Sequence, residues 1–137
     1  MFFYTRDGGK FRMLDGDRIA VLCAVFLKEL IAAAGLELNL GCVQTAYANG
    51  GSTAHLESLK IPVACAKTGV KHLHHLALNY DVGVYFEANG HGTVLFSDPA
   101  LATIKAATRD DPAEAAALSS LRHVVDLINQ TVGDAIS

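Results

Sequence analysis

The feature that most constrains the fold of this chain is a repeated unit, an apolar run that ends in a polar, glycine-bearing turn. The unit occurs three times, with apolar runs at 40–45, 61–66 and 82–86. The residues between the runs have helical patterns, from about 52 to 59 and from about 70 to 79. Strands that alternate with helices predict a parallel sheet, and right-handed crossovers bring the three turns to one edge of it. Sheets of this kind bind ligands at that edge.

The whole chain is expected to form a single three-layer domain of the α/β class. Its 137 residues and 51% hydrophobic content allow one proper core but not two comfortable ones. A first helix should be capped by Asp15 or Asp17 and stop at Gly35, and another should begin near Asp111. Thr93–Phe96 reads as an antiparallel strand. We therefore expect a mostly parallel, four-to-five-stranded mixed sheet, flanked by helices, with one antiparallel edge strand.

Local patterns add detail to this expectation. The N-terminal residues predict a hairpin, with strands at 2–5 and 11–14 around a turn at 6–10. Residues 97–99 predict a turn or a helix cap. Two helices show apolar stripes at the 3,4 spacing, the first from Ile19, Leu22, Cys23, Phe26, Leu27, Leu30 and Ile31, the last from Leu118, Leu121, Val125 and Ile128.

Composition excludes several functional classes. The three cysteines, Cys23, Cys42 and Cys65, lie in apolar runs and predict buried thiols in a reducing compartment. A formal net charge of -3 gives no electrostatic reason to bind nucleic acid or an anionic membrane. The apolar stretches are too short to cross a bilayer and no leader is evident. We expect a cytoplasmic protein with a small-molecule ligand.

The third turn carries the most specific chemistry. Glu87 and Asn89 follow the apolar run 82–86, and Gly90 lets the backbone turn tightly. A carboxylate accepts hydrogen bonds, whereas an amide both donates and accepts them, so the pair could bracket two neighbouring hydroxyls. This hypothesis requires the three turns to meet at one edge of the sheet and Glu87 to be reachable from solvent. The alternative is an ordinary turn with solvated polar residues.

Three segments closely resemble the phosphohexomutase superfamily, in the branch that acts on phosphorylated N-acetylglucosamine. They are Thr45-Ala46-Tyr47-Ala48-Asn49-Gly50, Thr68-Gly69-Val70-Lys71-His72-Leu73-His74-His75 and Phe86-Glu87-Ala88-Asn89-Gly90-His91-Gly92-Thr93. The residues 129–135 are also similar to the end of the third domain of these enzymes. The resemblance covers nearly the whole chain. It implies that residues 1–137 are the sugar-binding third domain of a four-domain enzyme, truncated at both ends.

The resemblance implies an activity for the intact enzyme. It would interconvert N-acetylglucosamine 6-phosphate and 1-phosphate through a bisphosphorylated sugar, with a phosphoserine and magnesium, and supply the precursor of UDP-N-acetylglucosamine. Because the intermediate must turn end for end, the site should bind the vicinal hydroxyls at positions 3 and 4 of the sugar in either pose. The substrate-binding residues would be Thr68, Gly69, Lys71, Glu87, Asn89 and Gly90, with Lys71 near a phosphate and His91 as the tentative catalytic residue.

Other parts of the intact enzyme are expected to lie outside this chain. The magnesium loop of the family has three alternating aspartates before an arginine, whereas only Asp15 and Asp17 precede Arg18, which favours helix caps. We expect no metal or cofactor bound by this chain. The phosphoserine loop and the final domain also have no counterpart in this sequence. We expect Ser52, Ser58 and Ser97 to cap helices or to lie on the surface. The chain alone should be inactive, with the remaining domains of its own enzyme as partners.

Several alternatives stay open from the sequence. His72, His74 and His75 lie close enough on a helix to suggest a metal-dependent hydrolase, although no carboxylate or cysteine completes the set. A polar, partly buried face at a domain boundary is the simpler interpretation. Tyr47 and Asn49 could line the ligand cleft, or Asn49 could belong to a turn before a helix. A stand-alone, non-catalytic module that binds a sugar phosphate or nucleotide is a further possibility.

Overall fold

The computed structural model describes residues 2–4 and 9–131. The strands in this part of the chain are β1 (Phe2–Tyr4), β2 (Phe11–Met13), β3 (Leu40–Thr45), β4 (Val63–Ala66), β5 (Val82–Phe86) and β6 (Gly92–Phe96). The helices are α1 (Gly16–Ala33), α2 (Gly50–Ser58), α3 (Val70–Ala77), α4 (Asp98–Ala106) and α5 (Pro112–Leu127). None of these helices is long and apolar enough to cross a membrane.

Four strands form one mixed sheet in the order β4-β3-β5-β6. The central strands are parallel, with Cys42 opposite Val63 on β4 and opposite Val84 on β5. β6 pairs antiparallel with β5 at the edge. The expected fold class is confirmed, an α/β domain with a mostly parallel sheet and one antiparallel edge strand, and the sheet has four strands. Because β3, β4 and β5 run in one direction, their carboxyl ends share one edge.

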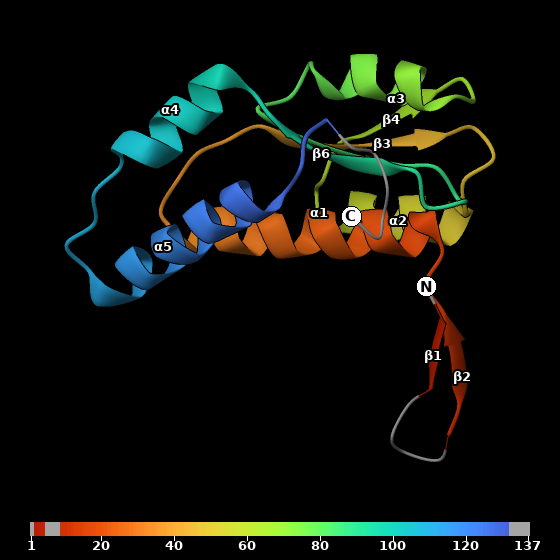
Figure 1. Cartoon of the computed structure of the whole chain (residues 1–137), viewed down its shortest axis with the longest axis horizontal. Helices are drawn as coiled ribbons and strands as arrows, with labels where there is room; N and C mark the ends of the chain where they lie inside the picture. Colours follow the sequence, from red (N-terminus) through yellow and green to blue (C-terminus); the bar gives the residue numbers. More distant parts are fainter. Residues whose placement is uncertain (1, 5–8, 132–137) are drawn as a thin grey trace.

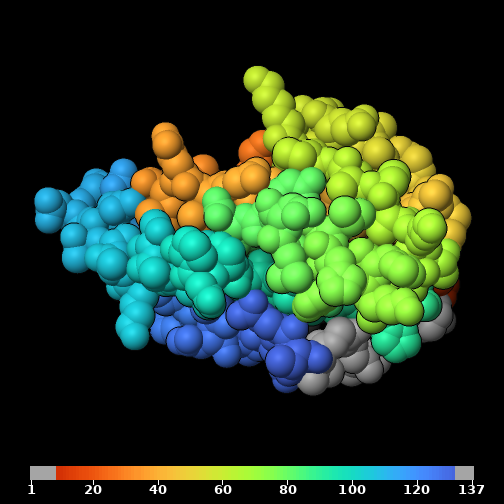
Figure 2. Space-filling view, turned by 90° about the horizontal axis from the view of Figure 1, so that it is seen from above, coloured from red at the N-terminus to blue at the C-terminus, as the bar shows by residue number. Residues whose placement is uncertain are grey.

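Helices cover both faces of the sheet, which gives the three layers that the sequence predicts (Figure 1). α3 lies on one face and packs through Leu73 and Ala77 against Val43 and Tyr85. α1 lies on the other face, with α2 and α5 on the same side. From the α3 side, the green surface around this helix covers the middle of the molecule (Figure 2).

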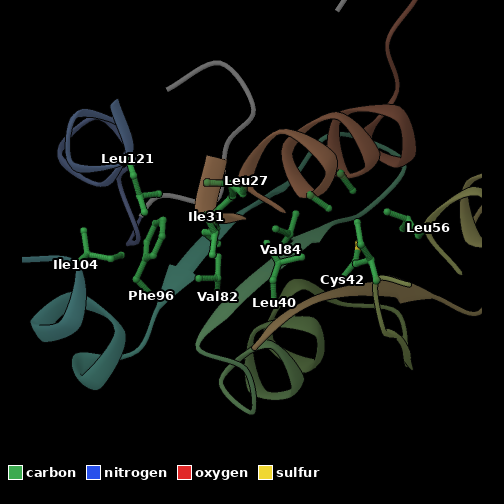
Figure 3. Packing of buried hydrophobic residues seen from close by; sticks show 14 of the residues in the cluster. Leu27, Ile31, Leu40, Cys42, Leu56, Val82, Val84, Phe96, Ile104 and Leu121 are labelled. Atoms are coloured by element: carbon green, nitrogen blue, oxygen red, sulfur yellow. The ribbon is translucent and has the colours of Figure 1, made fainter. Parts of the chain in front are cut away.

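The larger part of the core lies between α1 and the sheet. Leu27 and Ile31 of α1 meet Val82 and Val84 of β5, and Leu121 of α5 closes the cluster at one end (Figure 3). Leu27 and Leu121 are 1% and 0% exposed. Burial of side chains of this size stabilises a fold by roughly 1.5–3 kcal/mol each. The sheet edge with the turns is therefore held by a rigid scaffold.

The apolar stripe predicted for α1 is only partly correct. Leu27 and Ile31 are buried, but Leu22 and Phe26 are 61% and 49% exposed. The small residues Ala20 and Ala24 take the buried positions instead. The helix approaches the sheet through these small side chains, so the larger ones turn outward. A search for large apolar residues at the 3,4 spacing misses this arrangement.

Helix boundaries follow the capping rules. Asp15, not Asp17, caps α1, because its side chain accepts the N–H of Arg18. The helix stops before Gly35, which has φ +62. Asp111 caps α5 as predicted, and Ser97 caps α4. Asn49 caps α2, so this helix begins at Gly50 rather than near residue 52.

Two other expectations change in the structure. β4 begins at Val63 rather than at residue 61, because Ile61 turns into the core and Pro62 has no N–H to donate. Cys42 is buried and Cys23 is partly buried, but Cys65 is exposed. The prediction of three buried thiols is wrong for Cys65 because β4 is an edge strand with one side uncovered.

The N-terminal hairpin is confirmed as an antiparallel pair of β1 and β2. It extends away from the α/β domain as a separate two-stranded ribbon (Figure 1). The predicted turn between the strands lies mostly outside the described residues, as does the end of the segment 129–135. Phe11 and Met13 of β2 are 55% and 44% exposed. A ribbon of two strands has little stability of its own in water.

Candidate functional site

The three predicted turns meet at the same edge of the sheet. The turn after β4 contacts the turn after β5, because Gly69 N–H donates to Glu87 Oε1 at 2.9 Å. The start of α1 links the turn after β5 to the turn after β3, through Gly16 N–H to Ala88 O at 3.0 Å and Asn49 N–H to Asp17 Oδ2 at 2.8 Å. These bonds join segments that are distant in the sequence. The structure therefore confirms that the turns converge.

Glu87 is the central side chain of this edge. It is only 7% exposed, so the alternative of a turn with solvated side chains does not hold for this residue. Its bond to Gly69 places the carboxylate at the N-terminus of α3, where the helix dipole favours a negative charge. Oε2 has no hydrogen-bond partner among the described residues, and it is not sealed from solvent as Asp17 Oδ1 and Thr45 Oγ1 are. One acceptor of Glu87 therefore remains for a ligand.

Asn89 is exposed, and the two ends of its side-chain amide have different roles. Its Oδ1 accepts the backbone N–H of His91 at 2.8 Å and lies 3.3 Å from His91 Nδ1. Because a backbone N–H is a donor, the atom that faces it must be the amide oxygen. The Nδ2 group has no partner among the described residues and remains a free donor. The exposed His91 side chain is held beside Asn89.

The hairpin turn that carries these side chains is closed by its own backbone. Gly90 N–H donates to Glu87 O at 2.8 Å, and Glu87 N–H donates to His91 O at 2.8 Å. Gly90 has φ +99, a conformation that side chains rarely adopt. The predicted need for glycine at position 90 is confirmed, and the turn is a fixed platform.

The turn after β4 presents the other predicted residues. Gly69 has φ +115 and precedes the first residue of α3, as the sequence predicts. No side chain of this turn caps α3. The N–H of Gly69 is instead accepted by Glu87, which follows another strand. Thr68 and Lys71 are exposed, and Lys71 makes no ion pair with a described residue. Exposed helix N–H groups beside a free ammonium group favour an anion such as phosphate.

Sequence reasoning missed the part that the first turn of α1 has in this site. Gly16 and Asp17 are both buried, and Asp17 is only 6% exposed. The pattern Asp-Gly-Asp predicts helix caps, which is correct only for Asp15. The signal that could have revealed more is the glycine itself, because glycine is a poor helix former and needs a reason to stand at a helix start.

Of the two residues considered for the cleft near β3, only one has a defined contact. Asn49 Oδ1 accepts Gly51 N–H at 2.9 Å and so caps α2, while its Nδ2 has no partner among the described residues. Tyr47 is 56% exposed. A groove of about 570 Å³ lies between α1 and α2, lined partly by Leu14, Leu22 and Val25. The groove lies beside the turns rather than between Glu87 and Lys71, because none of the predicted sugar-binding residues lines it.

A metal ion has no ligand set in the part of the chain that the structure describes. No three His, Cys, Asp or Glu side chains come together there. Asp15 caps α1 and Asp17 holds the N–H of Asn49, so the two aspartates have structural partners. His74 Nδ1 lies 3.1 Å from the hydroxyl of Tyr85, whose pKa is raised by burial. This contact is that of a polar side chain packed on the sheet.

The arrangement offers several polar groups to a ligand. A carboxylate oxygen and an amide donor without partners among the described residues stand two residues apart, and the ammonium group of Lys71 belongs to the first turn of α3. Such a set fits adjacent hydroxyls together with an anionic group.

Comparison with known proteins identifies the family. Residues 15–137 match the family described as phosphoacetylglucosamine mutase AMG1, domain III. The chain is 52% identical to mouse phosphoacetylglucosamine mutase over 139 aligned residues, which cover 100% of this chain and 26% of the relative. It is 56% identical to phosphoacetylglucosamine mutase 2 of Schizosaccharomyces pombe, over 98% of this chain and 25% of the relative. The chain thus spans about a quarter of the length of these relatives.

Solved structures agree with the sequence comparison. N-acetylphosphoglucosamine mutase of Aspergillus fumigatus, in complex with GlcNAc-6P and magnesium, superimposes with a TM-score of 0.91 and 55% identity over 98% of this chain and 28% of that chain. A substrate complex of N-acetylglucosamine-phosphate mutase gives a TM-score of 0.90 and 52% identity, over 98% of this chain and 26% of that one. That enzyme is described as a member of the α-D-phosphohexomutase superfamily. The chain therefore belongs to the phosphoacetylglucosamine mutase family.

Proposed function

We propose that the intact protein interconverts N-acetylglucosamine 6-phosphate and 1-phosphate, and that this chain supplies the loop that binds the sugar. Relatives over 50% identical are mutases of this kind, and one of them binds GlcNAc-6P. Glu87 and Asn89 would hold two adjacent sugar hydroxyls, as acceptor and donor. The observation that carries the proposal is that each of these side chains is anchored by one atom and leaves the other free.

Side chains that are anchored by one atom and bind with the other suit a substrate that must bind in two orientations. A bisphosphorylated sugar that turns end for end exchanges its phosphates but keeps a pair of vicinal hydroxyls in the middle. A grip on the middle can serve both halves of the reaction. Because the anchored atoms hold the side chains in place before the sugar arrives, little conformational entropy is lost on binding.

The neighbouring turn would bind a phosphate. Lys71 makes no ion pair within residues 2–4 and 9–131, and Thr68 and Gly69 lie at the N-terminus of α3, where an anion is favoured. His91 is held next to Asn89 and would hold a phosphate or assist a proton transfer at the sugar. These roles of Lys71 and His91 depend on the sugar being bound by Glu87 and Asn89.

Magnesium in the intact enzyme would be held by other parts of the protein. A solved relative binds magnesium together with GlcNAc-6P, whereas the described residues of this chain offer no ligand set. The chain alone is therefore expected to bind the sugar without turning it over.

The rest of the protein would contact the exposed apolar side of α1. Leu22 and Phe26 of α1 and Phe11 and Met13 of β2 are all at least 44% exposed. The α1–α2 groove lies beside them. Exposed apolar side chains gathered in this way are typical of a surface that another part of a protein covers.

The proposal is tested by two variants of Glu87 in the full-length protein. Glu87→Gln keeps an acceptor for Gly69 but removes the charge, and should lower kcat/KM for N-acetylglucosamine 6-phosphate by roughly 10- to 100-fold. Glu87→Ala also frees the Gly69 turn and should be more harmful. Glu57→Gln, on the exposed side of α2, is the matched control and should be neutral. Near-normal turnover of both Glu87 variants would refute the proposal.

A further inference from the structure

The geometry points to Gly16 as a positioning residue for the sugar-binding loop. The missing side chain of Gly16 lets the first turn of α1 support the turn from Glu87 to Gly90, and so sets where Glu87 and Asn89 meet the sugar. This inference rests on the function proposed above. Gly16 itself touches no substrate in this account, because it acts through the backbone of the loop.

The contact is between two backbones and leaves no space. Gly16 N–H donates to Ala88 O at 3.0 Å. A Cβ atom added to Gly16 would overlap the carbonyl oxygen of Glu87, lie 2.7 Å from its carbonyl carbon and 3.1 Å from the nitrogen of Gly90. The carbonyl oxygen of Glu87 is the one that closes the turn by accepting Gly90 N–H. No flexible side chain is available to move aside.

The first turn of α1 is itself fixed from two sides. Asp15 caps the helix, and Asp17 Oδ2 accepts Asn49 N–H at 2.8 Å. Leu27 and Ile31 of the same helix are buried in the core. Since the helix cannot retreat, a side chain at position 16 must push the Glu87 turn away from it.

A displaced turn would weaken sugar binding before it harms the fold. In the Glu87 carboxylate, Oε1 accepts the N–H of Gly69 and Oε2 faces the ligand. A shift of the Glu87 backbone therefore moves both contacts. A misplacement of about 1 Å in a binding group can lower a rate by as much as 10²-fold.

Gly50 provides a matched control. It is the first residue of α2, as Gly16 is the first residue of α1. A Cβ atom added to Gly50 would meet no atom within 4 Å. Alanine at the two positions therefore makes the same chemical change at the same place in a helix, and only the contact with the loop differs.

The experiment compares Gly16→Ala and Gly50→Ala in the full-length protein. For Gly16→Ala we expect KM for N-acetylglucosamine 6-phosphate to rise and kcat/KM to fall on the order of 10²-fold. Gly50→Ala should stay within about twofold of the parent protein. A loss of folded protein would lower the apparent kcat and leave KM unchanged, so the two causes are separable. A normal KM and kcat/KM for Gly16→Ala would overturn the inference.

Combination with Glu87→Ala tests whether Gly16 acts through the loop. If it does, Gly16→Ala should cost little more in the Glu87→Ala background, because the effects of coupled residues do not add. Full additivity would contradict the inference. A harmful Glu87→Gln with a harmless Gly16→Ala rejects the positioning role alone, whereas near-normal turnover of both Glu87→Gln and Glu87→Ala rejects the proposed function and with it this inference.

Hydrogen exchange in the parent protein decides the matter if Gly16→Ala does not fold. The amide of Gly16 is bonded to Ala88, so it should exchange more slowly when N-acetylglucosamine 6-phosphate stabilises the loop. An exchange rate at Gly16 that does not respond to the sugar phosphate would overturn the inference.

Discussion

In Asn89, one atom of the side chain supports the loop and another is proposed to bind the ligand. Oδ1 accepts the N–H of His91, and Nδ2 would donate to the sugar. Asn89→Asp keeps an oxygen for His91 N–H but replaces the free donor by an acceptor. We expect an unchanged thermal midpoint and a roughly tenfold or greater loss of kcat/KM for the sugar phosphate, because the side chain then has no N–H to donate to the sugar oxygen. Asn79→Asp, at an exposed position, controls for the added charge. Kinetics that stay normal in Asn89→Asp would show that the amide does not donate to the sugar.

The same residues show what could be predicted from sequence at this scale. Glu87, Asn89 and Gly90 are recognisable because an apolar run stops at two polar groups and a glycine. The bond from Gly69 to Glu87 is not recognisable, since it joins two turns 18 residues apart. The contact of Gly16 with Ala88 is also hidden, because a backbone-to-backbone contact leaves only a glycine in the sequence.

Among the elements, β3 is one of the two inner strands of the sheet, and its Cys42 is buried in the core. Burial, with smaller effects from Cys23 and Asp17, raises the pKa of Cys42 to about 12. The unfolded chain loses this proton near pH 9, so the unfolded state is favoured as pH rises. From about pH 9 to 12 the free energy of unfolding should fall by up to ~1.4 kcal/mol per pH unit from this thiol.

Cys42→Ala should remove this part of the alkaline loss, while Cys65→Ala should keep it because Cys65 is exposed. Urea unfolding at pH 8, 9 and 10 measures the difference in slope. Equal slopes for Cys42→Ala and the parent chain would mean that Cys42 is not held as a buried thiol.

Elements were predictable where local chemistry decides them. Asp111 and Gly35 mark the ends of helices because caps depend on nearby residues only. The buried side of α1 was not predictable in full, because Ala20 and Ala24 allow a close approach that depends on the sheet beneath them. The start of α2 was missed by two residues since glycines are poor helix formers, yet the Asn49 cap is sufficient here.

In the whole molecule, α1 has two sides. One side is buried in the core, and the other is the exposed surface that we expect the rest of the protein to cover. Leu27→Ala should destabilise this chain by about 2–5 kcal/mol, because Leu27 is 1% exposed in the core. Leu22→Ala, five residues earlier and 61% exposed, should change stability by no more than about 0.5 kcal/mol. In the full-length protein Leu22→Ala should cost more, as covered apolar area is lost. Equal costs in both proteins would argue against a partner on this face.

The parallel arrangement of β3, β4 and β5 could be predicted from the sequence, because the repeated strand-turn-helix unit requires parallel neighbours. The separate sheet of β1 and β2 could not be predicted in this way, because nothing in the local pattern says whether these strands join the main sheet.

In the full-length protein, we propose, one hexose lies across the ends of β4 and β5 and is held by Glu87 and Asn89. A crystal structure of that protein with N-acetylglucosamine 6-phosphate tests this placement. We expect Glu87 Oε2 and Asn89 Nδ2 within about 3.2 Å of two adjacent sugar hydroxyls. A sugar bound in the cleft with both atoms out of hydrogen-bond range would contradict it.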